Sequence, residues 1–445
     1  MAVESTKSYW HREPSEKLLG HRTTAELPAT ADVVVVGSGI TGAFAARELI
    51  GGGKKVVLLE AREACWGATG RNGGHCQPFI YAAKPAVSRF ELGTYNFLKD
   101  LVAKNKISCD WETVGGVHVL PSKEVLDLVS KHLDRLKRDH PDLADQAKIV
   151  TDKEELQKLR VPAAFAAVYQ PNAAKLWPYK LVAWVLERLL DEHDASVFNL
   201  QTKTPVDHLQ RVGATWILHT PRGQIAARSV VLATNAYTSH LLPKLSGFLV
   251  PVRGQVCALT PPADSSPLEH SHVWETPDGG DDYLVQRPSG ELILGGERLG
   301  VPDCQVGLSR DDTFDPVVGQ RLRAALHGAV KLNPPGQADD PTLPATYEWT
   351  GIMGYSRDGY PWVGRVPTSL GGEDGLWISA GYTGHGMPVA ARCAIAVAHE
   401  MLGWKKDIEL PAEYRIGDGR ADRARVMVIP STLEEEIRAV IGAAL

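Results

Sequence analysis

The feature that most constrains the fold lies between Ala31 and Glu60. The run ADVVVV, residues 31–36, is a continuous apolar stretch typical of a strand buried on both faces. GSGITG follows, and then AFAARELIGGG, in which apolar side chains share one helical face before a glycine stop. A second apolar strand, KVVLLE, ends at Glu60. The order strand, glycine turn, helix, strand and acid predicts a dinucleotide-binding βαβ unit.

Each glycine of this turn has a physical role. Gly37 permits the tight turn, Gly39 lets the backbone approach a pyrophosphate, and Gly42 lets helix and strand pack closely. The helix N-terminus offers N–H groups and a partial positive charge to the phosphates. Glu60 stands where a carboxylate can accept hydrogen bonds from both ribose hydroxyls, which disfavours NADP. These residues leave NAD and FAD open.

A glycine-rich stretch, GATGRNGGH (residues 67–75), follows soon after this unit. Such clusters mark unusual backbone geometry or close approach to another group, and a flexible surface turn is the alternative. NAD-binding folds normally continue from the second strand into a crossover helix, whereas a glycine loop suits a longer, flatter cofactor. We interpret the stretch as a loop laid against a ligand, with Arg71 and Asn72 as polar contacts.

A second glycine turn lies near the C-terminal end. LWISA reads as a short strand, GYTGHGM as a turn, and VAARCAIAVAHEML as a helix. In a flavoprotein, such a helix end can face the pyrimidine side of the ring and stabilise the negative charge that develops on reduction. A tight turn without a ligand is the alternative reading.

These motifs together resemble the FAD-dependent D-amino-acid oxidase family, whose relatives include glycine oxidase, sarcosine oxidase and γ-glutamylputrescine oxidoreductase. The resemblance continues through VVLATNAY, PVRGQ, YLVQRPSGELILGG, DGYPWVGR and ISAGYTGHGM, in family order. ATGRNGG, and SYW ahead of the first strand, look closest to the γ-glutamylputrescine enzyme. The alternative of an NAD dehydrogenase does not account for either glycine-rich segment, GATGRNGG or GYTGHGM.

The resemblance implies an α/β protein with a Rossmann-type FAD-binding domain of the glutathione-reductase kind and a second, antiparallel-sheet substrate domain. We expect a discontinuous FAD domain over 31–90, 165–245 and 346–405, and a substrate domain over 91–164 and 246–345. Residues 1–30 and 406–445 are expected to be extensions, the latter with a helix over STLEEEIRAVIGAAL. KEVLDLVSKHLDRLKRD reads as an amphipathic helix.

By the same resemblance, FAD is held non-covalently, because Gly351 stands where sarcosine oxidase links its flavin to a cysteine. Backbone groups near Val206 fall where the family holds adenine. The implied cofactor-binding residues are Gly37, Ser38, Gly39, Ile40, Thr41, Gly42, Glu60, Ala61, Arg62, Ala68, Thr69, Arg71, Asn72, Gly73, Gly74, His75, Val206, Ala233, Thr234, Gly354, Gly384, His385, Gly386 and Met387.

Departures from the relatives bear on the substrate. Met353 replaces the arginine that clamps a substrate carboxylate in glycine and D-amino-acid oxidases, and Pro388 replaces a lysine of sarcosine oxidase. An amine whose carboxylate is distant or absent therefore fits better. The candidate catalytic and substrate-contacting residues are His75, Tyr283, Trp349, Met353 and Arg357. Ile293 occupies the position of an oxygen-activating lysine, which leaves the choice between oxidase and dehydrogenase open.

The expected reaction is oxidation of an amine C–N bond by hydride transfer to flavin N5, with imine hydrolysis and reoxidation by O2 or another acceptor. One alternative is an amino-acid oxidase whose carboxylate clamp has moved to Arg253, Arg298 or Arg357. Another is a flavin-binding scaffold without turnover, because a fold alone does not imply function.

Length, net charge and cysteine content limit the classes of partner and compartment that we expect. A length of 445 residues predicts two domains, and a net charge of -5 gives no footprint for nucleic acid. No apolar run approaches a membrane span, and the N-terminus lacks the apolar core of a signal peptide. Six scattered cysteines without a CxxC pair suit a cytoplasmic protein with reduced thiols. His270 and His272 are too few to predict a metal site, and we expect a monomer or homodimer.

Overall fold

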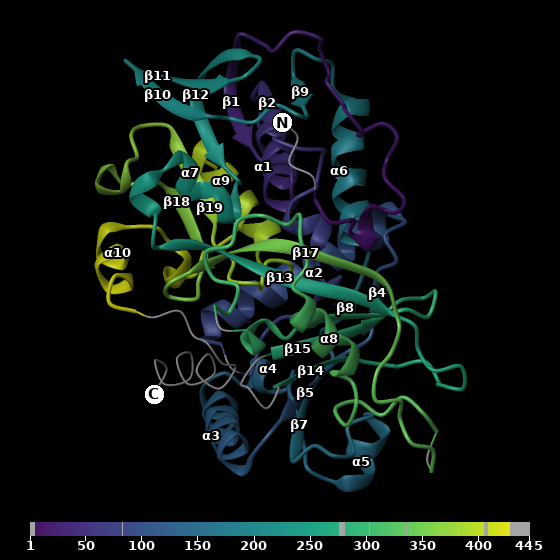
Figure 1. Ribbon diagram of the computed structural model, residues 1–445. Helices are drawn as coiled ribbons and strands as arrows, with labels where there is room; N and C mark the ends of the chain where they lie inside the picture. Colours follow the sequence, from purple (N-terminus) through teal and green to yellow (C-terminus); the bar gives the residue numbers. More distant parts are fainter. Residues whose placement is uncertain are drawn as a thin grey trace.

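The computed structural model describes residues 5–81, 83–275, 281–301, 303–334, 336–404 and 408–427. Two large sheets dominate it, with helices around both (Figure 1). The mixed α/β architecture agrees with the fold class expected from the sequence. The helix expected over residues 431–445 lies outside the described residues. Among the helices of the described ranges, none has the length and apolar character that crossing a bilayer requires.

The first sheet contains the predicted dinucleotide-binding unit. Its strands are β1 (Thr30–Val36), β2 (Val56–Leu59), β9 (Phe198–Gln201), β10 (His208–Val212), β11 (Thr215–Thr220), β12 (Gly223–Leu232), β18 (Trp362–Arg365) and β19 (Leu376–Ala380). β1 lies between β2 and β12 and runs parallel to both. β9 pairs with β2 and β19 with β12, also in parallel, so the carboxyl ends of five strands meet at one edge.

Both faces of this sheet are buried, as the unbroken apolar run of β1 predicts. Successive side chains of a strand point to opposite faces. Val33 and Val35 face a core that helices α1 (Ile40–Gly51), α2 (Pro85–Asn105), α6 (Pro178–Glu192) and α9 (Ala390–Leu402) complete. Val34 and Val36 face a second core, which the β10–β11 hairpin helps to cover.

The second sheet, here called the roof, is mostly antiparallel, as expected. Its strands, in spatial order, are β17 (Ala345–Ser356), β13 (Leu249–Leu259), β16 (Leu292–Gly296), β15 (Asp281–Gln286), β14 (Ser271–Glu275), β5 (Gly116–Leu120), β7 (Ala166–Gln170) and β6 (Lys148–Val150). β14 and β5 form a parallel pair. β13 and β17 cross the middle of the molecule, between the first sheet and the rest of the roof (Figure 1).

Two of the expected domain boundaries cut into the roof. β17 pairs with β13 along its whole length, although residues 346–405 were assigned to the FAD domain. β7 pairs with β5 and β6, although the FAD domain was expected to resume at residue 165. The reason is the same in both cases: ladder partners lie far apart in the sequence, so local pattern does not reveal which sheet a strand joins.

The remaining elements surround the two sheets. They are the strands β3 (His75–Cys76), β4 (Glu112–Thr113) and β8 (Ala174–Lys175), and the helices α3 (Lys123–Asp139), α4 (Pro141–Ala144), α5 (Lys153–Lys158), α7 (Thr238–Leu241), α8 (Pro316–Ala324) and α10 (Asp418–Ala424). The predicted amphipathic helix is α3, which buries Val125, Val129 and Leu133 in a core shared with β5 and β7.

The N-terminal segment is an integral part of the fold. Tyr9 and Trp10, in the 3₁₀ turn η1 (Tyr9–His11), are fully buried. Ser8 Oγ donates to the carbonyl of Gly70 at 2.8 Å, and the Trp10 indole donates to the carbonyl of Asn72. The segment expected to be an extension therefore packs behind the glycine loop and holds its backbone.

Candidate active site

A cavity of about 1660 Å³ lies between the first sheet and the roof. Its wall includes Gly37 and Glu60 from the first sheet's βαβ unit, and Tyr283 and Met353 from the roof. Ligand pockets commonly measure about 300–1,000 Å³. This cavity therefore has room for a dinucleotide together with a second small molecule.

The first glycine turn has the backbone geometry that a pyrophosphate cradle requires. Gly37 has φ +104°, and a Cβ there would lie 2.6 Å from the carbonyl oxygen of Ala233. At Gly42 a Cβ would lie 1.8 Å from the carbonyl oxygen of Gly37, so only glycine lets α1 pack this close. Gly37 and Gly39 line the cavity beside the N-terminus of α1, whereas Gly42 packs behind it.

Glu60 lies at the end of β2, where the ribose carboxylate was expected. Its Oε2 accepts hydrogen bonds from Ser38 N at 3.0 Å and Ser38 Oγ at 2.6 Å, and its Oε1 accepts from Arg62 N at 2.8 Å. These bonds fix the carboxylate at the cavity wall. Arg62 lines the same wall, but its guanidinium is ion-paired with Asp311 at 2.8 Å.

Other predicted cofactor contacts line this part of the cavity. They are Ser38, Ile40, Thr41, Ala61, Val206, Ala233 and Thr234. Ala233 and Thr234 follow β12, and Val206 follows β9, so the strand ends of the first sheet bring them together. The wall therefore combines apolar side chains with the exposed backbone of several strand ends.

The glycine loop lies against the cavity as a 3₁₀ turn, η2 (Ala68–Arg71), followed by extended backbone. Asn72 stabilises it, because its Nδ2 donates to Thr69 O at 3.0 Å and its Oδ1 accepts from Gly74 N at 2.8 Å. Gly73 lies directly against Tyr283, since a Cβ there would be 1.9 Å from the phenol ring. Ala68, Thr69, Asn72, Gly73 and His75 all line the cavity, and Gly74 packs on Trp10 behind it.

Arg71 makes several contacts within the protein, while its Nη1 has no hydrogen-bond partner among the described residues. Its Nε donates to Thr350 O at 2.6 Å, its Nη2 donates to Thr6, and Asp311 lies 3.1 Å away. Burial lowers the pKa of the guanidinium to about 10. The side chain thus joins the loop, the N-terminal segment and β17, although part of it reaches the cavity wall.

Two further predicted site residues, Trp349 and Gly354 of β17, do not line the cavity. Trp349 is fully buried and does not line the cavity, because its indole turns away and donates to Arg71 O at 2.7 Å. Gly354 also lies off the wall, since it allows β17 to approach Asn235, whose Oδ1 would lie 2.5 Å from a Cβ. Their contribution to the site is structural.

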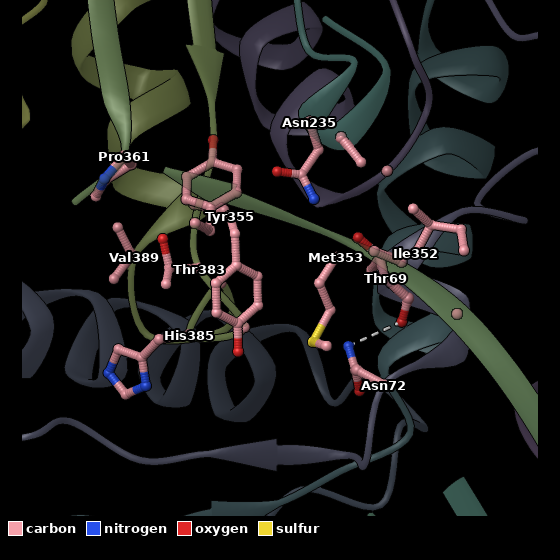
Figure 2. A pocket seen from close by; sticks show the side chains of 18 of the residues that line it. Thr69, Asn72, Asn235, Ile352, Met353, Tyr355, Pro361, Thr383, His385 and Val389 are labelled. Atoms are coloured by element: carbon pink, nitrogen blue, oxygen red, sulfur yellow. Dashed lines mark hydrogen bonds between the residues drawn. The ribbon is translucent and has the colours of Figure 1, made fainter. Parts of the chain in front are cut away.

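Met353 and Tyr355 are the β17 residues that face the cavity centre. Figure 2 shows them next to each other, with Thr69 and Asn72 beside Met353 and with Thr383 and His385 beyond Tyr355. A Cβ on Gly384 would lie 3.5 Å from both Met353 Sδ and Tyr355 Oη. β17 therefore spans the gap between the two glycine loops.

The second glycine turn also lines the cavity. Gly384, His385, Gly386, Met387 and Pro388 line it, directly before α9. The turn is held to β17 by Thr383 N, which donates to the carbonyl of Gly354 at 2.8 Å. His385 Nε2 lies 3.0 Å from Glu91 Oε2 of α2.

Two more histidines line this end of the cavity, and both are kept neutral. Burial, with repulsion from neighbouring histidines as a smaller cause, lowers the pKa of His75 and of His118 to about 3. His75 Nε2 is 2.9 Å from Ser271 Oγ, and His118 Nδ1 is 3.0 Å from the Tyr81 hydroxyl. At neutral pH these side chains offer hydrogen bonds without charge.

The three arginines considered as carboxylate clamps lie in different settings. Arg253 does not line the cavity, and it bonds to Gln305 and Thr313 instead. Arg357 lies at the wall, but donates to the carbonyls of Gly247, Arg425 and Met427. Arg298 is buried at the wall, with its guanidinium 5.1 Å from the centre of the Tyr355 ring.

Several cavity residues were missed from the sequence. They are Phe79, Tyr81, Glu91, His118, Tyr355 and Tyr382. Most belong to no recognisable motif, and the fold brings them in from separate segments. The sequence did contain an indication for Glu91. Its carboxylate stands at helical spacing from Val87 and Leu98, on a helix face that is otherwise apolar.

Comparisons with known proteins agree with this architecture. A family model described as FAD dependent oxidoreductase matches residues 32–400. Glycine oxidase of Pseudomonas aeruginosa is 26% identical over 395 residues, covering 86% of this chain and 97% of that protein. Gamma-glutamylputrescine oxidoreductase of Escherichia coli is 24% identical over 422 residues, covering 90% of each.

Solved structures show the same fold. Glycine oxidase from Geobacillus kaustophilus superposes with a TM-score of 0.70 at 19% identity, covering 88% of this chain and 99% of that chain. L-amino acid deaminase from Proteus vulgaris also gives 0.70, at 20% identity, covering 90% of this chain and 97% of that chain.

Proposed function

Because the chain belongs to the FAD-dependent oxidoreductase family, we propose that it oxidises the C–N bond of an amine that needs no α-carboxylate. The observation that carries this proposal is the position of Met353. It lies at the cavity centre between the two glycine loops, where the resembling amino-acid oxidases have an arginine. An apolar thioether cannot hold a carboxylate.

The residues present fit FAD. Gly37, Gly39 and the N-terminus of α1 would hold the pyrophosphate, and Glu60 the ribose. Thr69 to Gly73 and Gly384 to Met387 would line the two ends of the flavin. Gly351 lies at the cavity wall and offers no nucleophile for a covalent link, so we propose non-covalent binding. The flavin supplies the hydride acceptor that amine oxidation needs.

The chain's own residues would orient the amine and exclude water. Tyr283 and Tyr355 present aromatic surface, and His75 and His118 present neutral hydrogen-bonding groups. An alkylamine must lose its ammonium proton before its neighbouring carbon can give up hydride. Burial of the amine among these side chains favours its neutral form, because loss of water penalises the charged form.

One observation supports a second candidate. Arg298 is buried at the cavity wall, so a substrate carboxylate could be held there instead of at the position of Met353. The chain would then be an amino-acid oxidase with a relocated clamp. Of the three arginines considered, Arg298 and Arg357 line the cavity, and Arg298 is the one that is buried there.

The test is anaerobic mixing of the purified yellow protein with polyamines, γ-glutamyl amines, N-methyl amino acids and D-amino acids. Bleaching by amines that lack an α-carboxylate supports the proposal. Bleaching by α-amino acids alone rejects it in favour of the Arg298 clamp. Release of the flavin by acid tests non-covalent binding, and readmission of air tests O2 as the electron acceptor.

A further inference from the structure

A buried carboxylate and a cavity histidine meet beside the second glycine turn. Glu91 is 4% exposed, and its Oε2 accepts a hydrogen bond from Phe79 N at 2.7 Å while lying 3.0 Å from His385 Nε2. A buried carboxylate is costly without such partners. α2 and the turn therefore hold one polar pair in place, although they are nearly 300 residues apart in the sequence.

His385 differs from the other two histidines at this end of the cavity. The His75 and His118 rings contact neutral partners, Ser271 and Tyr81, and stay uncharged. The side chain of His385 is 41% exposed and lines the cavity, with a carboxylate against its ring. An adjacent carboxylate stabilises an imidazolium ion, so His385 is the member of this group suited to hold a proton.

We propose that His385, held by Glu91, takes the proton that the substrate ammonium must lose before its C–N bond is oxidised. The inference rests on the proposed function. In this step an N–H bond of the substrate breaks, its electron pair remains on the substrate nitrogen, and the proton bonds to an imidazole nitrogen of His385. His385 is thus assigned as a general base, and Glu91 as the residue that positions it.

The need for such a base follows from ordinary amine chemistry. Alkylamines have pKa values near that of lysine, about 10.4, so almost all substrate arrives protonated at neutral pH. A positioned base typically contributes about 10²–10⁴-fold to a rate. The neutral His75 and His118 then bind the deprotonated amine without competing for its proton.

The other ionisable groups around the pair do not replace it. They are His75 of β3, His118 of β5, Tyr81, Tyr355 of β17, Tyr360 and Tyr414. Burial raises the pKa of Tyr81, of Tyr360 and of Tyr414, so these phenols stay protonated. The other charged groups near these tyrosines are paired with one another, Lys84 with Glu413 at 3.2 Å and Arg420 with Asp358 at 2.6 Å.

The experiment compares wild type with His385→Gln and Glu91→Gln, using His219→Gln as a matched change at a half-buried histidine of β11 that does not line the cavity. The rate of anaerobic flavin bleaching is measured between about pH 6 and about pH 10, which spans the pKa values of histidine and alkylamines. At neutral pH we expect His385→Gln to lose about 10²-fold or more, Glu91→Gln to lose less, and His219→Gln to match wild type.

The pH dependence separates a base from a merely structural residue. The bleaching rate of His385→Gln should rise steadily with pH until the pH reaches the pKa of the free amine, because only unprotonated substrate can react. A weakly basic amine, already neutral at the assay pH, should restore its rate. If His385→Gln keeps the wild-type rate and pH profile, the inference is wrong and the proposed function stands. If no amine bleaches wild type, the proposed function itself fails, and the inference with it.

A second readout does not depend on turnover. In protein labelled at histidine and stripped of flavin, the NMR signal lost in His385→Gln identifies that ring. In Glu91→Gln this signal should titrate at lower pH, because the stabilising carboxylate is gone. An unchanged titration in the folded variant would show that the carboxylate does not govern the ring, and would overturn the inference.

Discussion

The indole nitrogen of Trp349 donates a hydrogen bond to the main-chain oxygen of Arg71 across 2.7 Å. In the opposite direction, Arg71 Nε donates a hydrogen bond to the carbonyl of Thr350 at 2.6 Å. The two bonds tie adjacent residues of β17 to the middle of the glycine loop, and all three residues are buried. The roof strand and the loop therefore form one rigid wall of the cavity.

Replacing Trp349 by phenylalanine should weaken this wall. The ring volume is largely kept, but a buried carbonyl loses its donor, which costs about 1–3 kcal/mol. We expect lower thermal stability and poorer retention of FAD on gel filtration. Trp404→Phe is the matched control, because Trp404 is 43% exposed. Equal melting temperatures and flavin contents in the two variants would show that the bond is dispensable.

Gly42→Ala should abolish FAD binding. Its Cβ would lie 1.8 Å from the carbonyl oxygen of Gly37, so α1 must move away from the phosphate turn. Gly51→Ala, at the end of the same helix, adds the same methyl group with nothing within 4 Å, and should keep its flavin. Flavin absorbance per protein after purification distinguishes the two. A yellow Gly42→Ala protein would contradict the proposed packing role of this glycine.

The dinucleotide unit was predictable because its determinants are local. Gly37, Gly42 and Glu60 lie within one βαβ unit, and each role follows from the turn and strand ends that the sequence itself indicates. The second glycine turn was equally visible. Strand, turn and helix follow one another as β19, residues 381–389 and α9.

The remaining parts of the site depend on contacts between distant segments. Arg71 contacts Thr6 and Asp311, and nothing local in the sequence reveals these two partners. Its Nη1 has no hydrogen-bond partner among the described residues, so its predicted contact to the ligand stays a prediction. Trp349 lies four residues before Met353 on the same strand, with regular pairing between them. It is nevertheless covered by Arg71 and by Tyr9 of the N-terminal segment, which local pattern does not reveal. His118 reaches the cavity through the order of the roof strands, which motif reading does not give.

Acid should destabilise the protein between about pH 6.5 and about pH 3, partly through His75 and His118. Burial lowers the pKa of both in the folded state to about 3, against about 6.5 in the unfolded chain. The unfolded state therefore binds more protons in this window, and stability falls as pH falls. Each histidine contributes a slope of up to about 1.4 kcal/mol per pH unit.

Thermal unfolding of wild type and of His75→Gln at several pH values measures this effect. The variant should lose less stability than wild type on going from neutral to acid pH, whatever its stability at neutral pH. His219→Gln, at a half-buried site outside the cavity, should follow wild type. Parallel curves for wild type and His75→Gln would mean that His75 is protonated as readily in the folded chain as in the unfolded one.

Met353→Arg should shift substrate preference toward α-amino acids. The side chain of Met353 lies at the cavity centre, close to Gly254 and Gly384, so a guanidinium there would meet a carboxylate beside the reacting carbon. A charge-assisted hydrogen bond contributes about 1.5–3 kcal/mol, which corresponds to roughly 10–100-fold in kcat/KM for an amino acid relative to the matching amine. Met353→Leu keeps the site apolar and should keep the wild-type preference. Met353→Arg could instead retain flavin and turn over amines without gaining a preference for carboxylates. In that case the reacting carbon of the substrate does not lie beside Met353. Met353 would then not set the substrate class, and Arg298 would become the residue to examine.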